Sequence, residues 1–408
     1  MSKLKRIAAI DIGTTKIVCM IAEVDTSGKT EIKGFGVAPP DGFRLGVVIS
    51  LDKATESCSR AIEQAEKMAQ CRIGNSPVFT SITGDHIKHL PGLGAVPVSR
   101  PNKGIQPRDI EDVIRQAQTI RLPNDEQILH VIPMQYIVDG QKGVRDPRNL
   151  FGVRLEVEAL LIIGSVTAIA NVYRVLERLD IKNRSLLLQS LATSYGVCDE
   201  EDKELGVAVI DIGGVLDVSI YREGEIRWTK MLPVGAANIT KDVAIGLRTS
   251  YQQAESVKRE FGVAMAGMIE RDEALTIEDA SGRGPKQVSR RLLASIIEPR
   301  VEELLNLVDA EIRKSQLADG LSGGVILTGG GALLPGIDIL AEQICGMPVK
   351  IGRPERVNGP REVVSNPAFA TAVGLIRCAV EGKSSQLHRL PAPSVGRRLW
   401  EDLKAWFS

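Results

Sequence analysis

A six-residue pattern occurs twice in this chain, 200 residues apart, and constrains the fold more than any other feature. The copies are residues 8–13 (AAIDIG) and 208–213 (AVIDIG). Each runs into a glycine-containing turn and a second β-favouring segment, at 17–24 and 218–221. This order predicts two strand–turn–strand hairpins with an Asp at the mouth of each turn. Solenoid repeats are only ~20–50 residues long, so we expect two similar α/β halves facing each other across a cleft.

The remaining segments are expected to build out these two halves. At 408 residues the chain is too long for one ordinary core. Pro- and Gly-rich punctuation between Gly84 and Gly152 indicates an inserted α+β subdomain, with a helix at 108–120, short strands at 128–131 and 136–138, and a closing strand at 154–163. The predicted division is a first lobe of 1–83 and 164–196 to which 360–380 returns, an inserted subdomain of 84–163, a second-lobe core of 197–227 and 320–359, an outer subdomain of 228–319, a linker of 381–396 and a terminal helix of 397–408.

The outer subdomain contains a long helical pattern over 288–315 that is interrupted by Pro299. Proline in a helix interior costs ~3 kcal/mol. We therefore expect a kink or a break near Glu298.

The first turn has the residues that a phosphate-binding turn needs. Gly13 lets backbone approach a phosphate, Thr14 and Thr15 offer hydroxyl donors, and Lys16 adds a positive charge. Asp11 is placed to face Mg²⁺ through water, because that ion dehydrates reluctantly. An ordinary hairpin turn also favours Asp and Gly. However, the same Asp-x-Gly motif recurs after an equivalent strand at 211–213, and this repetition argues for a nucleotide site.

A glycine loop follows an apolar strand near the end of the second half. Residues 328–332 (TGGGA) lie between the strand and a predicted helix at 334–344. Three consecutive glycines remove every Cβ, so a flat or anionic ligand can lie against backbone amides. As the third element of one cleft, the loop supports the nucleotide interpretation.

These elements, in this order, resemble the actin-like ATPase superfamily. Segments 189–196 (QSLATSYG) and 366–375 are similar to its two connecting helices, and 254–259 (AESVKR) has its Glu-x-x-Lys pattern. The position of the insertion, together with 146–156 (DPRNLFGVRLE), resembles the FtsA family of bacterial division proteins over essentially the whole chain.

The resemblance implies an ATP- and Mg-binding protein that polymerises as actin-like protofilaments and tethers FtsZ filaments to the inner face of the cytoplasmic membrane at the division site. It implies that other membrane proteins of the divisome bind the inserted subdomain. Carried onto this sequence, it gives Gln189 the place of a water-positioning residue and Arg300 a place in the stretch that receives the acidic FtsZ peptide. The remaining implied sites are phosphate contacts at Gly13, Thr14, Thr15, Lys16, Gly213 and Gly214, metal-facing Asp11 and Asp211, adenosine contacts at Glu255 and Lys258, and contacts to the α-phosphate and the base at Gly329, Gly330, Gly331 and Ala332.

One departure from the family pattern concerns the second phosphate turn. Residues 211–217 (DIGGVLD) lack a third glycine and a Thr or Ser, and the turn is one residue shorter. Fewer hydroxyl donors near the γ-phosphate weaken the expectation of hydrolysis more than that of binding. We therefore expect ATP binding with at most weak ATPase activity.

The last residues form an amphipathic pattern that needs no family to interpret. At 100° per residue, large apolar side chains share one side of a helix over 397–408, while Arg397, Arg398, Glu401 and Lys404 lie elsewhere. A helix this short is marginal in water and gains stability where its apolar face is buried, for example in anionic lipid. Docking on a partner or on the protein's own core are the alternatives. The proposed membrane-facing residues are Leu399, Trp400, Leu403, Trp406 and Phe407.

Composition narrows the remaining possibilities. Lys+Arg and Asp+Glu both total 51, so the chain has no net positive charge that would attract nucleic acid. The six cysteines are scattered and are interpreted as small apolar residues in a reducing compartment. Two rival functions stay open: a small-molecule kinase of the same superfamily, which would need a catalytic base that we do not identify, and a PilM-like scaffold of an envelope machine, which would reach the membrane through partners.

Overall fold

The computed structural model describes residues 5–279 and 284–381. The predicted terminal helix and nearly all of the predicted linker lie outside these residues. The strands are β1 (Lys5–Ile12), β2 (Ile17–Val24), β3 (Thr30–Ala38), β4 (Phe43–Arg44), β5 (Val47–Val48), β6 (Val78–Ile82), β7 (Lys88–Pro97), β8 (Glu126–Val138), β9 (Gln141–Val144), β10 (Arg154–Ser165), β11 (Arg184–Leu188), β12 (Val207–Ile212), β13 (Leu216–Arg222), β14 (Glu225–Leu232), β15 (Ala274–Glu278), β16 (Pro285–Ser289), β17 (Val325–Thr328) and β18 (Val349–Ile351).

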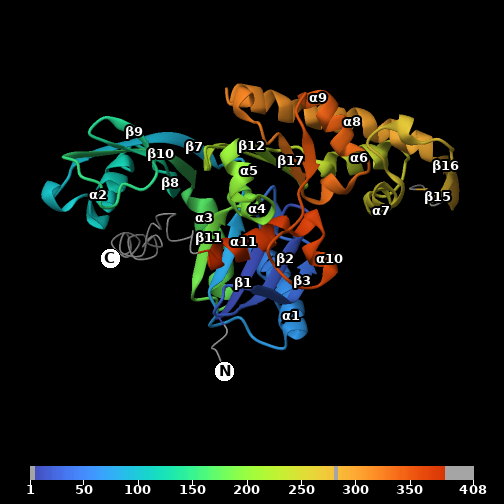
Figure 1. The fold of residues 1–408 in the computed structure, drawn as a ribbon. Helices are drawn as coiled ribbons and strands as arrows, with labels where there is room; N and C mark the ends of the chain where they lie inside the picture. Colours follow the sequence, from blue (N-terminus) through green and yellow to red (C-terminus); the bar gives the residue numbers. More distant parts are fainter. Residues whose placement is uncertain (1–4, 280–283, 382–408) are drawn as a thin grey trace. The chain divides into compact units, whose positions relative to one another are not determined.

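The helices lie between groups of these strands in a mixed α/β order (Figure 1). They are α1 (Leu51–Ala69), α2 (Pro107–Ala117), α3 (Val166–Arg178), α4 (Gln189–Val197), α5 (Glu200–Leu205), α6 (Ala236–Gly246), α7 (Tyr251–Phe261), α8 (Arg290–Lys314), α9 (Ile337–Cys345), α10 (Arg361–Val364) and α11 (Ala370–Val380), with short 3₁₀ turns η1 (Pro101–Lys103), η2 (Ala266–Met268), η3 (Ala318–Gly320), η4 (Gly330–Leu333) and η5 (Pro367–Phe369).

The chain divides into two compact units. One unit contains the described residues up to Asp85 together with Val175–Val380, and the other contains His86–Arg174. The first unit holds both copies of the repeated pattern and the second holds the insertion.

The duplication extends to the whole sheet of each lobe. The first sheet has the order β3-β2-β1-β6-β11 and the second has the order β14-β13-β12-β17-β18. In both, an antiparallel meander of three strands is extended by two parallel strands. The central strands β1 and β12 are apolar and are buried on both faces. Because they occupy the same place in the two sheets, Asp11 and Asp211 lie at equivalent positions near the carboxyl ends of these strands. The predicted pair of hairpins is confirmed.

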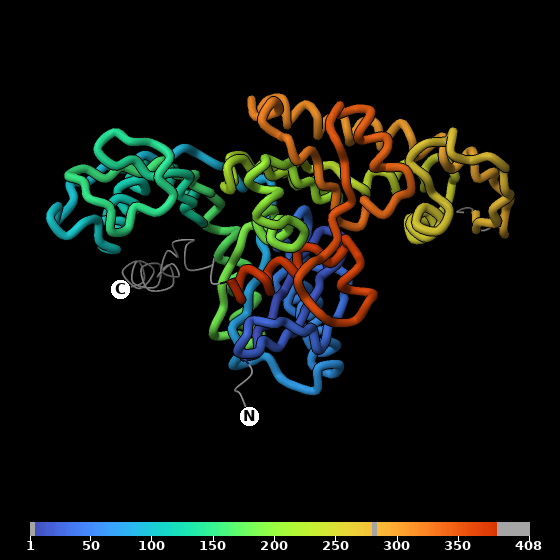
Figure 2. The backbone as a smooth tube through the Cα atoms, in the orientation of Figure 1, coloured from blue at the N-terminus to red at the C-terminus, as the bar shows by residue number. Residues whose placement is uncertain are grey.

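Two helices join the lobes, as the sequence predicts. After β18 the chain returns to the first lobe, visible in Figure 2 as the orange-to-red tube, and α11 packs against α4. A Cβ on Gly374 would lie 1.7 Å from the backbone oxygen of Ala192, and one on Gly196 would lie 2.2 Å from that of Ala370. Glycine at both positions therefore permits the close crossing of the helices.

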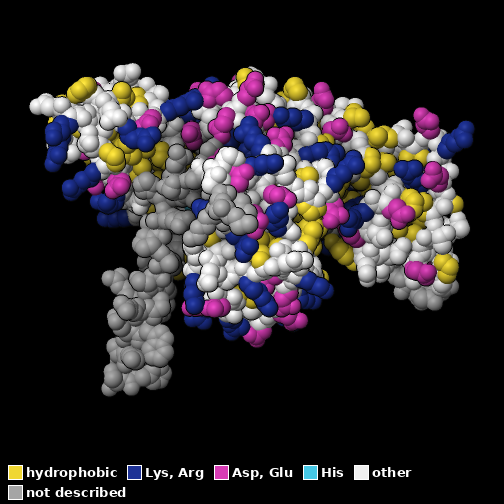
Figure 3. All heavy atoms as spheres, turned by 60° about the horizontal axis from the view of Figure 1, so that its bottom comes forward, with side chains coloured by type: hydrophobic (Ala, Val, Ile, Leu, Met, Phe, Trp, Pro, Cys, Tyr) yellow, Lys and Arg dark blue, Asp and Glu magenta, His cyan; other side chains and the backbone are white. Residues whose placement is uncertain are grey.

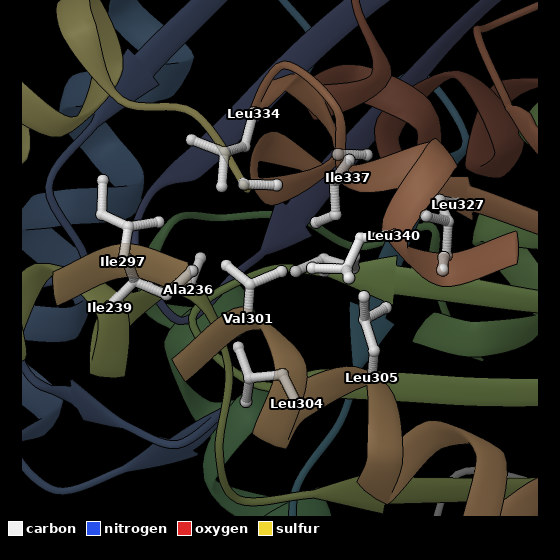
Figure 4. Packing of buried hydrophobic residues seen from close by; sticks show 14 of the residues in the cluster. Ala236, Ile239, Ile297, Val301, Leu304, Leu305, Leu327, Leu334, Ile337 and Leu340 are labelled. Atoms are coloured by element: carbon white, nitrogen blue, oxygen red, sulfur yellow. The ribbon is translucent and has the colours of Figure 1, made fainter. Parts of the chain in front are cut away.

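The core of the second lobe is built around α8. Figure 4 shows apolar side chains from α6, α8, α9 and β17 pointing toward one another, among them Ile297, Val301 and Leu327. The helix does not break near Glu298, because α8 runs without interruption from Arg290 to Lys314 with Pro299 inside it, and the alternative of a kink there stays a prediction. Its buried side chains continue on both sides of the proline, and burial of each yields ~1.5–3 kcal/mol, which together exceeds the cost of one proline.

The start of α8 also differs from the prediction. Residues 285–289 form strand β16, which pairs with β15 in a hairpin, and the helix begins one residue after Ser289. The Ser289 hydroxyl accepts a hydrogen bond from the Leu292 amide at 3.1 Å and caps the helix.

The inserted unit is a four-stranded antiparallel sheet, ordered β7-β10-β8-β9, with α2 packed against β7 and β10. The two short strands predicted at 128–131 and 136–138 are one strand, β8. Pro133 and Gln135 pair with Ala159 and Glu158, so Met134 forms a bulge beside the proline. The bulge accommodates the proline within the strand, although proline cannot donate a hydrogen bond to the ladder.

Candidate functional site: the phosphate turns and their buried carboxylates

The two predicted phosphate turns lie against each other in the first unit. The Gly13 amide donates to the Lys16 carbonyl at 3.1 Å, and the Gly213 amide donates to the Val215 carbonyl at 3.0 Å. A Cβ on Gly214 would lie 2.5 Å from Thr14 Oγ1. Only glycine at this position therefore allows the turns to approach so closely.

Asp11 lies buried at the end of β1 and is held by a serine from the neighbouring strand. Ser81 Oγ, on β6, donates to Asp11 Oδ1 at 2.8 Å and accepts from the Ile12 amide at 2.8 Å. Burial raises the pKa of Asp11 to about 6, with a smaller contribution from the charge of Asp211.

Asp211, its counterpart on β12, is held by both connecting helices. Thr193 of α4 and Thr371 of α11 donate to Asp211 Oδ2 at 3.2 and 3.3 Å, and their hydroxyls are 2.8 Å apart. Burial raises the pKa of this carboxyl too, although the threonine donors oppose the shift. The sequence motif identified Asp211 but neither threonine, because these residues lie 18 and 160 positions away.

Lys16 is placed beside an aromatic ring that the sequence did not single out. Its ammonium lies 4.0 Å from the centroid of Phe369, in η5, which makes an edge contact with Phe35. Desolvation lowers the pKa of Lys16, and the nearby Asp11 and Asp211 oppose the shift. A ring face is a favourable surface for a partly desolvated cation.

A third buried carboxylate, Asp217, was missed by sequence reasoning. It is the cross-strand neighbour of Asp211 in the β12–β13 hairpin. Gln189 Nε2 donates to its Oδ2 at 3.0 Å, and Thr83 Oγ1 donates to its Oδ1 at 3.3 Å. Burial and the charge of Asp211 raise the pKa of Asp217 to about 8. The spacing of Asp217 within a strand gives no signal that its carboxyl group faces Gln189 and Thr83.

The glycine loop serves packing as well as access. A Cβ on Gly329 would lie 2.2 Å from Asp211 Oδ1, and one on Gly331 would lie 2.4 Å from Ile212 Cγ2. A Cβ on Gly330 would meet nothing nearer than 3.9 Å. A ligand contact at Gly330 therefore stays a prediction, whereas Gly329 and Gly331 are glycine because the loop packs against β12. Ala332 is buried at the end of this loop.

The predicted adenosine contacts Glu255 and Lys258 form a pair on α7. Lys258 Nζ lies 2.6 Å from Glu255 Oε2 and donates to Thr240 Oγ1, on α6, at 2.8 Å. Burial lowers the pKa of Lys258. Their contacts fix the Glu-x-x-Lys motif against α6.

Arg300, the predicted partner contact, is already paired within the chain. Its guanidinium donates to the carboxylates of Asp242 and Glu303. An acidic peptide would have to compete with both groups for this side chain.

The donor set around the turns suits magnesium held partly by water. Among residues 5–279 and 284–381, no three His, Cys, Asp or Glu side chains form a cluster that could hold a metal ion. Two carboxylates, Asp11 and Asp211, are enough for an ion that keeps several water ligands and takes phosphate oxygens as further ligands. In the same residues, no helix combines the length and apolar character needed to cross a membrane.

Comparison with known proteins decides the family. A model of cell division protein FtsA matches residues 208–374, and a model of the SHS2 domain inserted in FtsA matches residues 84–163. The chain is 38% identical over 381 residues to cell division protein FtsA of Pseudomonas aeruginosa, covering 93% of this chain and 90% of that protein. The chain belongs to the FtsA family. It is 37% identical to the Neisseria meningitidis FtsA over 96% of this chain and 93% of that protein. This FtsA-family chain is thus a cell-division protein, an actin-like component of the divisome.

Solved structures agree with the actin-like fold predicted from sequence. The chain is similar to a structure of the PilM–PilN type IV pilus biogenesis complex, with a TM-score of 0.63 at 16% identity over 93% of this chain and 99% of that chain. It is also similar to Spiroplasma citri MreB5 bound to AMPPNP, with a TM-score of 0.57 at 14% identity over 93% of this chain and 98% of that chain. At these identities the likeness to solved structures concerns the fold alone. The FtsA relatives are 37–38% identical over nearly the whole chain, and they favour a division protein over the PilM-like and kinase alternatives.

Proposed function

We propose that this FtsA-family chain binds ATP with magnesium between its two phosphate turns. The observation that carries the proposal is the approach of two equivalent turns at Gly214 and Thr14, each following a strand with a buried Asp. Lys16 would contact the phosphates and Gly330 would leave room for the nucleotide. The second connection spans 213–215, against 13–16 in the first, and contains no hydroxyl donor. Hydrolysis is therefore expected to be slow.

Equilibrium binding of a fluorescent ATP analogue tests this proposal. Lys16→Ala should weaken binding by about tenfold or more, because a charge-assisted contact contributes ~1.5–3 kcal/mol. Lys33→Ala is the matched control, since Lys33 pairs with Glu31 on the edge strand β3. Magnesium should strengthen binding to the wild-type chain. Absence of binding at millimolar ATP would refute the proposal.

We infer further that the terminal segment attaches the protein to anionic membrane, which would place it at the cytoplasmic face of the cell membrane at the division site. Support comes from the apolar side of the 397–408 pattern, with Trp400 and Trp406. Partial burial of such side chains in a headgroup layer gives a reversible anchor of several kcal/mol.

Sedimentation with anionic liposomes tests the anchor. The intact chain should pellet with lipid, whereas a chain ending at Gly396 and the Trp400→Glu variant should stay in the supernatant. Glu401→Gln, on the polar side of the pattern, is the matched control and should pellet like the wild type. If the truncated chain pellets equally, the segment packs on the core or on a partner.

The proposed partners are FtsZ, further copies of this chain in actin-like protofilaments, and divisome proteins that bind the inserted unit. On the face drawn in Figure 3, Lys and Arg side chains are interspersed with Asp and Glu. A contact to the acidic FtsZ peptide would therefore depend on local groups, of which Arg300 is the proposed one.

Charge reversal on α8 tests the FtsZ contact. Arg300→Glu should weaken binding of the FtsZ C-terminal peptide, and binding should also weaken with added salt. Arg313→Glu is the control, since Arg313 lies on the same helix in an ion pair with Asp309. Equal losses in both variants would indicate a general charge effect and would rule out a specific role for Arg300.

A further inference from the structure

The side-chain amide of Gln189 is held on one side only. Gln189 begins α4 and is 6% exposed. Its Nε2 donates to Asp217, while its Oε1 is buried without a hydrogen-bond partner among the described residues. A buried acceptor without a donor costs ~1–3 kcal/mol, so such an atom indicates a place where a ligand or water binds.

The carboxyl group of Asp217 determines which end of the amide faces it. Its Oδ2 lies 3.0 Å from Gln189 Nε2 and its Oδ1 lies 3.3 Å from Thr83 Oγ1. When ionised, Asp217 can only accept hydrogen bonds, so the amide nitrogen must face it. When protonated on Oδ1, it can donate to the Thr83 hydroxyl while Oδ2 still accepts from Gln189. The observed amide orientation is therefore required by the ionised carboxylate and is compatible with the carboxyl protonated on Oδ1.

The neighbouring groups reinforce this orientation. Asp211, cross-strand from Asp217, also interacts with the Gln189 side chain, and this contact opposes the rise that burial causes in the pKa of Asp211. Two carboxyl groups thus lie on the donor side of one amide. Turning the amide over would direct its oxygen at them, which is unfavourable whenever the facing carboxyl group is ionised.

We propose that Asp217 is a positioning residue for Gln189, binding the amide nitrogen so that the amide oxygen stays available to a water molecule beside the phosphate turns. The inference rests on the nucleotide-binding function proposed above and deepens it. Asp217 acts through Gln189 and does not itself contact the nucleotide. Oε1 would accept a hydrogen bond from the water that attacks the γ-phosphate and so orient it.

A different role for Asp217 is to hold the lobes together through Thr83, which follows β6 of the first lobe. That role predicts that loss of the Thr83 hydroxyl is as harmful as loss of the carboxyl. It also predicts losses of stability and nucleotide affinity that add to those of Gln189 variants. The two roles therefore give different results in the same set of variants.

Single-turnover hydrolysis of labelled ATP by the full chain, measured alongside the ATP dissociation constant, tests the proposal. Asp217→Leu and Gln189→Ala should each slow hydrolysis by about ten- to a hundredfold, as expected for a misplaced reacting group. Each should leave the dissociation constant within about threefold of wild type. The double variant should be no slower than either single one, because both remove the same interaction.

Two conservative variants separate positioning from structure. Asp217→Asn should restore hydrolysis, because its Oδ1 can accept from Gln189 while its Nδ2 donates to Thr83. Thr83→Val should hydrolyse ATP at nearly the wild-type rate. Ser190→Ala is the matched control on α4: it removes the buried contact between Ser190 and Thr229, and should lower the melting temperature without changing hydrolysis.

Each remaining outcome decides between the proposals. If Asp217→Leu does not fold, Gln189→Glu replaces it, since this variant keeps an acceptor but loses the donor to Asp217 and should be as slow as Gln189→Ala. Additive losses, failure of Asp217→Asn to restore hydrolysis, or an equal loss in Thr83→Val would overturn the positioning role. A wild-type chain that binds ATP but never hydrolyses it would also overturn it while leaving nucleotide binding intact. A chain that binds no ATP would instead remove the proposed function itself.

Discussion

Among single residues, the glycines of the 329–331 loop differ in what a methyl group would encounter. Gly331→Ala brings a Cβ to 2.4 Å from Ile212 Cγ2, and we expect a loss of ~1–3 kcal/mol in the free energy of unfolding from overpacking. Gly330→Ala should leave stability nearly unchanged and should weaken ATP binding by about tenfold, because its Cβ enters open space. Urea denaturation and ATP titration of both variants check this. Equal destabilisation by the two would contradict the division of roles.

His130, on β8 of the inserted unit, gives a pH dependence of known sign. Burial lowers its pKa to about 4, against ~6.5 in an unfolded chain. The unfolded state therefore binds the proton first, so the contribution to stability is complete above pH 6.5 and is lost as the pH falls toward 4. The loss reaches about 3 kcal/mol by pH 4.

Urea denaturation of the wild-type chain and of His130→Leu at pH 7.5, 6 and 5 measures this dependence. The wild type should lose more stability on acidification than the variant, whatever their difference at pH 7.5. Parallel pH profiles would show that His130 titrates normally in the folded protein.

At the scale of elements, α8 shows packing prevailing over local propensity. Its 25 residues form one helix although Pro299 removes a hydrogen-bond donor from its interior. Pro299→Ala should therefore stabilise the second lobe, by up to ~3 kcal/mol if the helix does not otherwise rearrange. A rise in melting temperature checks this. Glu302→Ala, on the exposed side of α8, should change it little, and destabilisation by Pro299→Ala would show that a bend at the proline is needed for packing.

At the scale of the whole molecule, the two compact units should respond differently to nucleotide. Both phosphate turns lie in the first unit, while the inserted unit has its own core of α2 and sheet residues. Calorimetry of the full chain should show one transition that rises with ATP concentration, by ~2.7 kcal/mol at a hundred times the dissociation constant, and one that does not. A single transition that shifts as a whole would indicate that the units unfold together.

Much of the architecture could be predicted because it depends on motifs and apolar periodicity within short segments of the chain. The repeated strand and turn predicted two equivalent lobes, and the alternation of residues 154–163 predicted β10. The predictions that failed are those where local rules compete with packing. Pro299 does not break α8, because burial on both sides of the proline offsets the missing hydrogen-bond donor. The two strands predicted at 128–131 and 136–138 are one strand, β8, because a bulge accommodates Pro133.

The sequence by itself determined the duplicated halves, the two strand–turn–strand hairpins with Asp11 and Asp211, and the likeness to the FtsA family, because each depends on residues that are close together in the chain. Only the tertiary structure decided that Thr193 and Thr371 hold Asp211, that Phe369 lies beside Lys16, and that Asp217 orients Gln189. These contacts join separate strands and helices. Whether two such side chains meet depends on how the sheets and connecting helices pack. The local sequence around each residue does not indicate how far apart the two side chains lie in the folded protein.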